Sequence, residues 1–198
     1  MQRLAERRLV IATSNAGKLS EYRDLLADAG FTLVPFDSDV DEAGESYGEN
    51  ARLKAEAARD STGLPAIGDD AGVEVDVLGG FPGIRSARIG PTQKERTQAL
   101  LDKLQGQPQP WPARFVCTIA LAVPDGPTQL FEGTCRGEIV PEWRGNAGFG
   151  YDPVFLVPEV GRTFGEMAPE EKHKYSHRGA AVRAMLASGA LERLSPTS

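Results

Sequence analysis

The sequence predicts an α/β fold with a mixed sheet, and three observations support this prediction. An apolar run, a helical pattern and a second apolar run follow one another over residues 8–36, which is typical of a strand–helix–strand unit. Two long strand-like stretches, 113–123 and 128–140, flank a turn at Pro124–Pro127 and predict a hairpin. Parallel strands joined by a helix and an antiparallel hairpin together indicate a mixed sheet.

The first elements are assigned in chain order. Residues 8–13 form a compact apolar run with β-branched side chains, which predicts a buried strand. A polar turn at 14–17 follows, and the next apolar residues share one helical face: Leu19, Tyr22, Leu25, Leu26 and Ala29. Gly30 is the expected C-terminal cap of this helix, and residues 31–36 predict a second strand.

The next helix and two more strands follow from local signals. Ser46 and Glu49 have the spacing of a capping box, so an alanine-rich helix is expected from there to about Asp60. A brief apolar run predicts a strand at 65–69. Residues 72–78 alternate with period two, which is typical of a half-buried strand.

The elements that precede and follow the hairpin are also readable. Residues 79–83 (GGFPG) predict a loop, and Thr92 with Glu95 predicts a second capping box that opens a helix to about residue 105. A proline-rich connector leads to the hairpin. Beyond it, a strand is expected at 154–158, and the remainder is expected to be helical, ending with a helix over 180–194.

Length and composition exclude several classes of protein. A chain of 198 residues buries enough surface to fold as one domain, so residues 1–198 are predicted to form a single domain. No apolar run approaches the ~20 residues of a membrane helix, and the N-terminus does not resemble a secretion signal. With a formal charge of −6 and no basic block, nucleic-acid binding is disfavoured. A cytoplasmic protein without membrane or nucleic-acid partners is therefore predicted.

The turn that joins the first strand to the first helix is the first candidate site: Thr13, Ser14, Asn15, Ala16, Gly17 and Lys18. Free N–H groups and the positive end of a helix attract an anion there. The turn resembles a phosphate-binding Walker A loop, but Ala12 and Leu19 replace its first glycine and its Mg²⁺-binding hydroxyl residue. An ordinary strand–helix turn is the alternative.

Two adjacent carboxylates, Asp69 and Asp70, stand at the end of the predicted strand 65–69. Such a pair is placed to hold a hard cation or to polarise a water molecule. The alternative is a helix cap or a turn, where aspartate is common. Glu42, in an acidic loop over residues 37–44, is a candidate additional metal ligand.

The glycine-rich segment 145–153 contains Phe149, Gly150, Tyr151 and Asp152. Aromatic residues alternating with glycine favour a loop on which a flat ring stacks, and a structural turn is the alternative. The spacing does not match a dinucleotide-binding fingerprint.

A local basic cluster follows in an otherwise acidic chain: Lys172, Lys174, His177 and Arg178. Such a cluster either receives a polyanion or forms a solvated helix face. His173 and His177 are four residues apart, but they lack the other features of a zinc site. Ser176 is a candidate cap of the last helix. The two cysteines, Cys117 and Cys135, fall in predicted strands and are interpreted as core residues.

Taken together, these segments closely resemble the inosine triphosphate pyrophosphatase-like family, also called non-canonical purine or XTP/dITP diphosphatases. The matching segments run from about residue 9 to 187 and are ATSNAGK (12–18), ENARLKA (49–55), PAIGDDAG (65–72), VDVLGGFPGIRSAR (75–88), GFGYDPVF (148–155) and EEKHKYSHRG (170–179). The combination is more specific than any one segment. Residues 1–7 are an unmatched extension.

The resemblance implies an elongated central mixed sheet flanked by helices and two lobes with an active-site cleft between them. It also implies a homodimer that uses Mg²⁺. The implied reaction is hydrolysis of ITP, dITP or XTP between the α- and β-phosphates, which gives a nucleoside monophosphate and pyrophosphate. Such an enzyme removes deaminated purines from the nucleotide pool.

The resemblance also implies roles for individual residues. Asp70 is the implied proton acceptor and metal-linked carboxylate, supported by Asp69, with Glu42 as a further metal ligand. The segment from Thr13 to Lys18 is the implied triphosphate site, with Lys172 adding charge. Residues 149–152 line the base pocket, and His177 and Arg178 contact the purine.

Two positions depart from the family pattern, and two other functions remain as alternatives. Ala71, a further implied substrate contact, stands where the family often has serine, so only its backbone is available for binding. Ser14 replaces a common glycine. One alternative is a related diphosphatase that acts on modified pyrimidine nucleotides. The other is a catalytically silent nucleotide-binding module, which the presence of Asp70, Lys18 and Lys172 disfavours.

Overall fold

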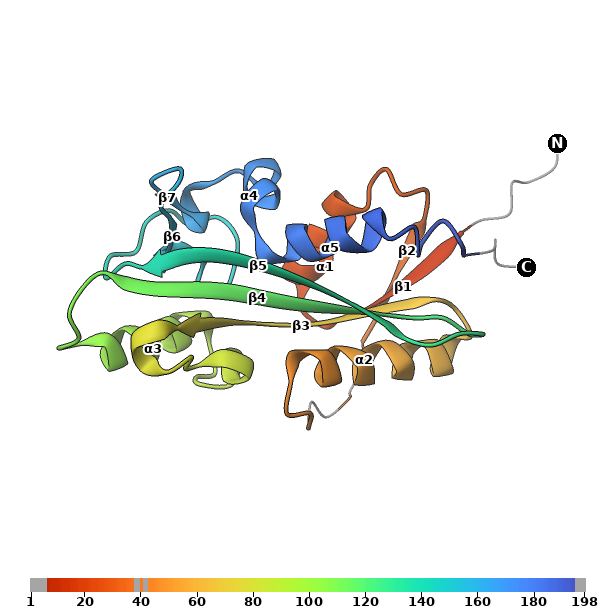
Figure 1. The fold of residues 1–198 in the computed structure, drawn as a ribbon, viewed down its shortest axis with the longest axis horizontal. Coiled ribbons are helices and arrows are strands. Elements are labelled where there is room, and N and C mark those ends of the chain that lie inside the picture. The colour runs from red at the N-terminus through yellow and green to blue at the C-terminus, as the bar shows by residue number, and fades with distance from the viewer. Residues whose placement is uncertain (1–6, 38–39, 41–42, 195–198) are drawn as a thin grey trace. The chain divides into compact units, whose positions relative to one another are not determined.

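Figure 1 shows the fold of the computed structural model, which describes residues 7–37, 40 and 43–194. These residues group into two compact units. Unit 1 takes the chain up to Asp70, residues Cys117–Gly133 and the chain from Ala181 onward. Unit 2 consists of Ala71–Val116 and Thr134–Ala180. Each unit is described by itself below, and the single domain over 1–198 stays a prediction.

The described residues form a mixed sheet with the strand order β2-β1-β3-β4-β5-β6-β7. Strand β1 is parallel to β2 and β3, whereas β6 is antiparallel to β5 and β7. The prediction of an α/β fold with a mixed sheet is therefore confirmed. The strands are β1 (Arg8–Ala12), β2 (Thr32–Phe36), β3 (Ala66–Val75), β4 (Trp111–Ala122), β5 (Gln129–Ile139), β6 (Phe155–Val157) and β7 (Arg162–Thr163).

In unit 1, helix α1 (Ala16–Leu25) follows β1 and helix α2 (Tyr47–Thr62) precedes β3. On the buried face of α2, Ala51 and Ala55 contact Ala120 and Ala122 of β4, and the side chains of Asn50 and Lys54 are buried on the same helix. Gly68 of β3 is required by this close approach, because a Cβ atom there would lie 2.5 Å from the carbonyl oxygen of Ala51. Helix α2 thus packs directly on the β3 backbone.

Unit 2 contains helices α3 (Gln93–Leu104) and α4 (Pro169–Tyr175) and the larger apolar core. Three aromatic rings form its centre: Phe155 lies 4.6 Å from Phe115 and 5.2 Å from Phe164 between ring centroids. Helix α5 (His177–Ala187) begins in unit 2 and ends in unit 1. Aromatic packing of this kind stabilises a core beyond the burial of its area.

The predicted helix starts are found where the capping residues stand. The Thr92–Glu95 capping box is confirmed at the start of α3, with both reciprocal hydrogen bonds present. At α2, Ser46 accepts from the Glu49 N–H at 3.2 Å, but the Glu49 carboxylate accepts from the Glu45 N–H instead of closing the box. Both caps satisfy backbone donors that the first helical turn leaves unpaired.

Several predicted boundaries are wrong. The strands expected at 65–69 and 72–78 are one continuous strand, β3, because Asp69 and Asp70 have polar partners and do not end it. Helix α1 ends at Leu25 and α5 at Ala187, four and seven residues before the positions expected. The two-residue strand β7 is too short to leave a pattern in the sequence. Tertiary partners thus override the local signals.

Within the described residues, no helix combines the length and the apolar character that crossing a bilayer requires.

Candidate functional site

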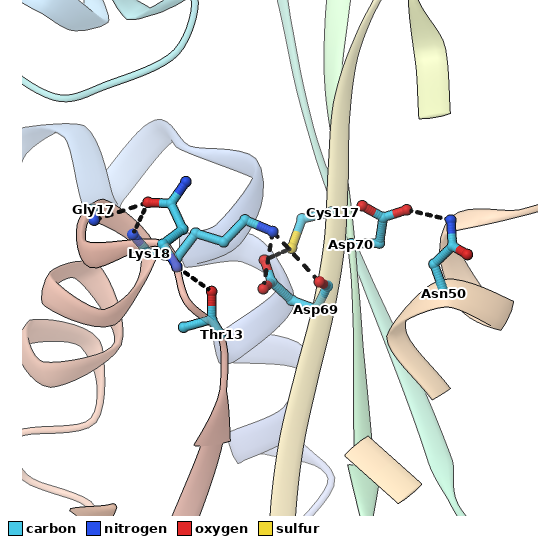
Figure 2. A network of polar contacts seen from close by, with 8 residues as sticks. Thr13, Gly17, Lys18, Asn50, Asp69, Asp70 and Cys117 are labelled. Atoms are coloured by element: carbon cyan, nitrogen blue, oxygen red, sulfur yellow. Dashed lines mark hydrogen bonds and ion pairs between the residues drawn. The ribbon is translucent and has the colours of Figure 1, made fainter. Parts of the chain in front are cut away.

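The turn between β1 and α1 is closed by its own polar groups (Figure 2). Asn15 caps α1, and its side-chain oxygen accepts from the backbone N–H groups of Gly17 and Lys18 at 2.9 and 3.1 Å. The Asn15 N–H donates to Thr13 Oγ1 at 3.1 Å. Ser14 and Ala16 are exposed. Because three amides of the turn are bonded within it, the positive group that the turn presents is the Lys18 ammonium.

The Lys18 ammonium is paired with Asp69. Its Nζ lies 3.1 Å from Asp69 Oδ1 and donates to the Asp69 carbonyl at 3.4 Å. The Asp69 side chain is 1% exposed and the Lys18 side chain 15%. Cys117, on β4, is 3.8 Å from the second oxygen of the same carboxylate. Asp69 is thus a buried counterion of a cation that still reaches solvent.

Asp70 has a different partner, on helix α2. Asn50 Nδ2 donates to Asp70 Oδ2 at 2.9 Å, and both side chains are buried. The other end of the Asn50 amide, Oδ1, accepts from the Gly44 N–H, also at 2.9 Å. The amide therefore joins the loop before α2 to the carboxylate on β3.

The two adjacent carboxylates lie on opposite sides of β3, as Figure 2 shows. Successive residues of an extended strand point to opposite faces, and the continuous strand through Asp69 and Asp70 imposes this alternation. The expectation of a paired two-carboxylate site is therefore not met. Asp69 faces Lys18, and Asp70 faces Asn50.

The Asp70 carboxylate is the type of ligand that suits a hard divalent cation. Mg²⁺ prefers oxygen ligands and is commonly held by one or two carboxylates together with substrate phosphates. Across residues 7–37, 40 and 43–194, no group of three or more acidic, histidine or cysteine side chains forms a metal cage. A single oriented carboxylate agrees with the Mg²⁺ pattern. Glu42, the further ligand that the sequence predicts, lies outside the described residues.

In unit 2, Asp152 organises the glycine-rich loop. Its Oδ2 accepts from the Phe149 N–H at 2.8 Å and from the Lys172 ammonium at 2.6 Å. Gly148 has φ +73°, and a Cβ atom there would overlap the Asp152 carboxylate. Glycine is needed at this position for both reasons.

The Phe149 ring lies between two cationic side chains. The Lys172 nitrogen is 4.9 Å from the ring centroid and the Arg178 guanidinium carbon 5.7 Å. Lys172 and Arg178 are buried, whereas Phe149 is half-buried. Cation–π attraction at these distances holds the ring in place. The loop predicted over 145–153 thus contains an aromatic ring that two cations hold in place.

Tyr151 is a structural anchor of the same loop. Its buried hydroxyl donates to the Ser86 carbonyl at 2.6 Å, and burial raises its pKa, so that the phenol keeps its proton. Ser86 in turn is held by the backbone of Val73 and Gly83. Gly150, next to Tyr151, has φ +64°. Ala71, a further predicted substrate contact, is a partly exposed residue of β3.

The two histidines lie on different helices, which disfavours the zinc alternative. His173 belongs to α4 and His177 is the first residue of α5. The His177 ring stacks on Phe115, with centroids 4.5 Å apart and planes 9° from parallel. Ser176 Oγ accepts from the Gly179 N–H at 3.1 Å, so the predicted cap of the last helix is present.

The basic cluster at 170–179 is not a solvated helix face. Lys172, His177 and Arg178 are 4%, 4% and 1% exposed, and only Lys174 of the four is on the surface. A buried cation needs a partner or a bound anion. Lys172 has Asp152 as such a partner.

Three residues of these networks are not predicted from the sequence. Asn50 lies in the segment ENARLKA, whose pattern indicates no role for it, although it contacts Asp70. Cys117 is predicted only as a core residue, and no motif points to Ser86. A buried asparagine inside an alanine-rich helix was the available signal, since buried amides require partners.

The chain is similar to proteins of one family along most of its length. A model described as the Ham1 family matches residues 9–188. A protein named dITP/XTP pyrophosphatase from Gloeobacter violaceus is 51% identical over 180 residues, which is 90% of this chain and 92% of that protein. A protein of the same name from Thermus thermophilus is 47% identical over 188 residues, 90% of each.

Solved structures agree with this similarity. The Staphylococcus aureus Ham1 protein has a TM-score of 0.82 and 37% identity, covering 94% of this chain and 100% of that one. A HAM1 protein from Coxiella burnetii has a TM-score of 0.83 and 38% identity, covering 94% and 99%.

Proposed function

Because this chain belongs to the Ham1 family, we propose that it is a nucleoside triphosphate pyrophosphatase. The proposed substrates are the non-canonical purine nucleotides dITP, XTP and ITP, and the products are a nucleoside monophosphate and pyrophosphate. The observation that carries the proposal is the similarity over 90% of the chain to relatives named dITP/XTP pyrophosphatase. The cellular role is removal of deaminated purines from the nucleotide pool.

Asp70 is the proposed proton acceptor. Hydrolysis breaks the α–β phosphoanhydride, and the attacking water loses a proton as its oxygen joins phosphorus. A positioned carboxylate takes this proton and typically contributes 10²–10⁴-fold to the rate. Asp70 is buried, and Asn50 fixes one of its oxygens, so its position is defined before substrate binds.

Lys18 is the proposed cation for the triphosphate, at the start of α1. Phosphoryl transfer depends mainly on positioning and charge neutralisation. The Lys18 side chain reaches solvent and its ammonium is held by Asp69. We assign Thr13–Gly17 to the same phosphate site and give Asp69 the role of counterion to Lys18.

Mg²⁺ is the proposed cofactor, held by Asp70 and by Glu42. When bound, the ion neutralises phosphate charge and polarises the attacking water. Asp70 supplies the type of ligand that Mg²⁺ prefers. Asp69 is not assigned as a ligand, because its carboxylate is paired with Lys18 on the other face of β3.

The proposed base-recognition residues are in unit 2. Phe149 offers a half-buried ring that cations hold in place, and such a face stacks with a purine. Hypoxanthine and xanthine carry a 6-keto acceptor where adenine carries an amino donor. A guanidinium N–H of Arg178 donates to the 6-keto oxygen, whereas it would meet the adenine amino group donor to donor, without a hydrogen bond. His177, Gly150, Tyr151, Asp152 and the Ala71 backbone complete the proposed substrate contacts, and Lys172 adds charge.

We further propose a cytoplasmic homodimer, with no membrane or nucleic-acid partner. Sedimentation equilibrium tests the dimer, and a mass of one chain would contradict it.

The function is tested with a panel of nucleotides: dITP, ITP, XTP, GTP, ATP and dUTP, each with Mg²⁺ and with product analysis. We expect pyrophosphate and the monophosphate from the first three. Release of orthophosphate and a diphosphate would refute α–β cleavage, and preference for dUTP would favour a pyrimidine diphosphatase. A wild-type protein that hydrolyses none of these nucleotides would refute the proposed pyrophosphatase activity.

A further inference from the structure

We propose that Asn50 is a positioning residue for Asp70, so that turnover depends on the Asn50 side chain although it takes no part in the chemistry. This inference rests on the proposed function, in which Asp70 accepts the proton. It is carried by the geometry of one buried amide with two different partners.

Both ends of the Asn50 amide are used. The N–H₂ group donates to Asp70 Oδ2, and the carbonyl oxygen accepts from the Gly44 N–H, each at 2.9 Å. Asn50 is 1% exposed and Asp70 6%. A primary amide offers a donor and an acceptor on two separate atoms, so it can bridge two partners. The second bond fixes the amide plane and so decides that a donor, and not an acceptor, faces the carboxylate.

The helix that carries Asn50 is itself held rigidly against β3. Asn50 stands in the first turn of α2, one residue after Glu49, whose N–H Ser46 caps. Over the following turn of α2 the helix lies directly on β3, because a Cβ atom at Gly68 of β3 would lie 2.5 Å from Ala51 O and 2.6 Å from Ala55 N. The Asn50–Asp70 bond thus connects two backbones whose separation is set by packing. It fixes where the Asp70 carboxylate points.

The expected effect follows from the orientation of one oxygen. Residues that orient a reacting or ligating side chain typically change activity about 10–100-fold when they are removed. A misplaced base lowers the rate of the chemical step, while the groups that bind the nucleotide stay in place. The Asn50 variants should therefore lose kcat and keep both KM and the affinity for dITP.

Two substitutions at Asn50 test this dependence. Asn50→Ala removes both hydrogen bonds, whereas Asn50→Asp is isosteric, keeps the acceptor for the Gly44 N–H and turns an acceptor toward Asp70. Each should lower kcat for dITP about 10–100-fold, with KM unchanged. The affinity for dITP should also be unchanged when it is measured by calorimetry in metal-free buffer, a readout that does not depend on hydrolysis.

Gly44 gives an independent route to the same amide. A Cβ atom at residue 44 would lie 2.7 Å from Asn50 Oδ1 and 2.8 Å from Glu49 Cβ, so Gly44→Ala pushes on the amide and on the start of α2 without changing either side chain of the Asn50–Asp70 bond. We expect a smaller kcat loss, about 3–10-fold, which becomes smaller still in the Asn50→Ala background, where the part transmitted through the amide is already lost because residues in one network are coupled. A full additive loss in the double variant would contradict the proposal.

Thr128→Val is the matched control. It removes another side-chain bond that anchors α2, from Thr128 Oγ1 to Glu56 at 2.6 Å, and leaves Asp70 and Asn50 untouched. Its kcat should equal that of the wild type. A wild type that is inactive on every nucleotide would refute the proposed function. An active wild type with Asn50→Asp at wild-type kcat, or with a raised KM and unchanged kcat, would overturn the role of Asn50 alone.

Discussion

Each unit of the molecule contains a buried aspartate–lysine pair, and the two pairs differ in how far they are closed. In unit 1, Lys18 and Asp69 are 3.1 Å apart, with the lysine side chain 15% exposed. In unit 2, Lys172 and Asp152 are 2.6 Å apart, with side chains 5% and 3% exposed. Asp152 also accepts from the Phe149 N–H.

The difference separates two uses of the same chemistry. A lysine whose side chain is partly exposed can exchange its carboxylate partner for a phosphate, because its ammonium keeps part of its hydration. A lysine that is almost fully buried cannot leave its carboxylate without leaving an unpaired charge in the interior. We infer that Lys18 of the unit 1 pair binds phosphate directly, whereas the unit 2 pair shapes the loop that carries Phe149, with Lys172 adding charge while it stays paired.

Stability should show the largest difference between the pairs. Asp152→Asn leaves the Lys172 ammonium buried beside a neutral amide, and the free energy of unfolding should fall by about 3–5 kcal/mol. Asp69→Asn should cost less, about 1–3 kcal/mol, because Lys18 can turn toward water. Urea unfolding of both variants measures the two losses. Equal losses would remove the distinction between a closed and an open pair.

The specificity attributed to unit 2 predicts a smaller effect. Arg178→Ala removes the donor assigned to the 6-keto group. The ratio of kcat/KM for dITP over dATP should fall about 10–100-fold, since an unpaired buried polar group costs about 1–3 kcal/mol. Steady-state kinetics on both nucleotides gives the ratio. If it is unchanged, base recognition lies elsewhere.

The smallest expected difference between the two units concerns their cysteines and the pH dependence of unfolding. Cys117 in unit 1 contacts a carboxylate, whereas burial, and less strongly Glu159, raises the pKa of Cys135 in unit 2 to about 11. Because the folded protein holds the thiol proton more tightly than the unfolded chain, the contribution of Cys135 to stability is complete below pH 9. This contribution is lost as the pH rises through about 11. Between pH 8 and pH 10, wild type should lose about 1.4 kcal/mol relative to Cys135→Ala. Parallel pH profiles of unfolding for the two proteins would contradict this.

The sequence was informative where the signal is local. The strand–helix–strand start, the hairpin and the Thr92 cap each depend on residues within a few positions of one another, and the structure contains all three. The motif resemblance to the pyrophosphatase family is confirmed by the match over residues 9–188.

The arrangement of the carboxylates was not accessible from local signals. Whether Asp69 and Asp70 end a strand or lie within it depends on partners that are distant in the chain: Lys18 is 51 residues from Asp69 and Asn50 is 20 from Asp70. Those partners let the strand continue, and a continuous strand points the carboxylates apart. Adjacency in sequence therefore suggested a joint site, and pairing in space assigns them different partners.

The central claim is that the two neighbouring aspartates have different roles, Asp70 as proton acceptor and Asp69 as counterion of Lys18. One side-by-side measurement tests it. Turnover of saturating dITP with Mg²⁺ is measured for Asp70→Asn and Asp69→Asn, with dITP binding determined by calorimetry. We predict that Asp70→Asn binds dITP and loses about 10²–10⁴-fold in kcat, while Asp69→Asn changes KM and keeps kcat within about threefold. Equal losses of kcat in the two variants, or near-wild-type kcat in Asp70→Asn, would contradict the account.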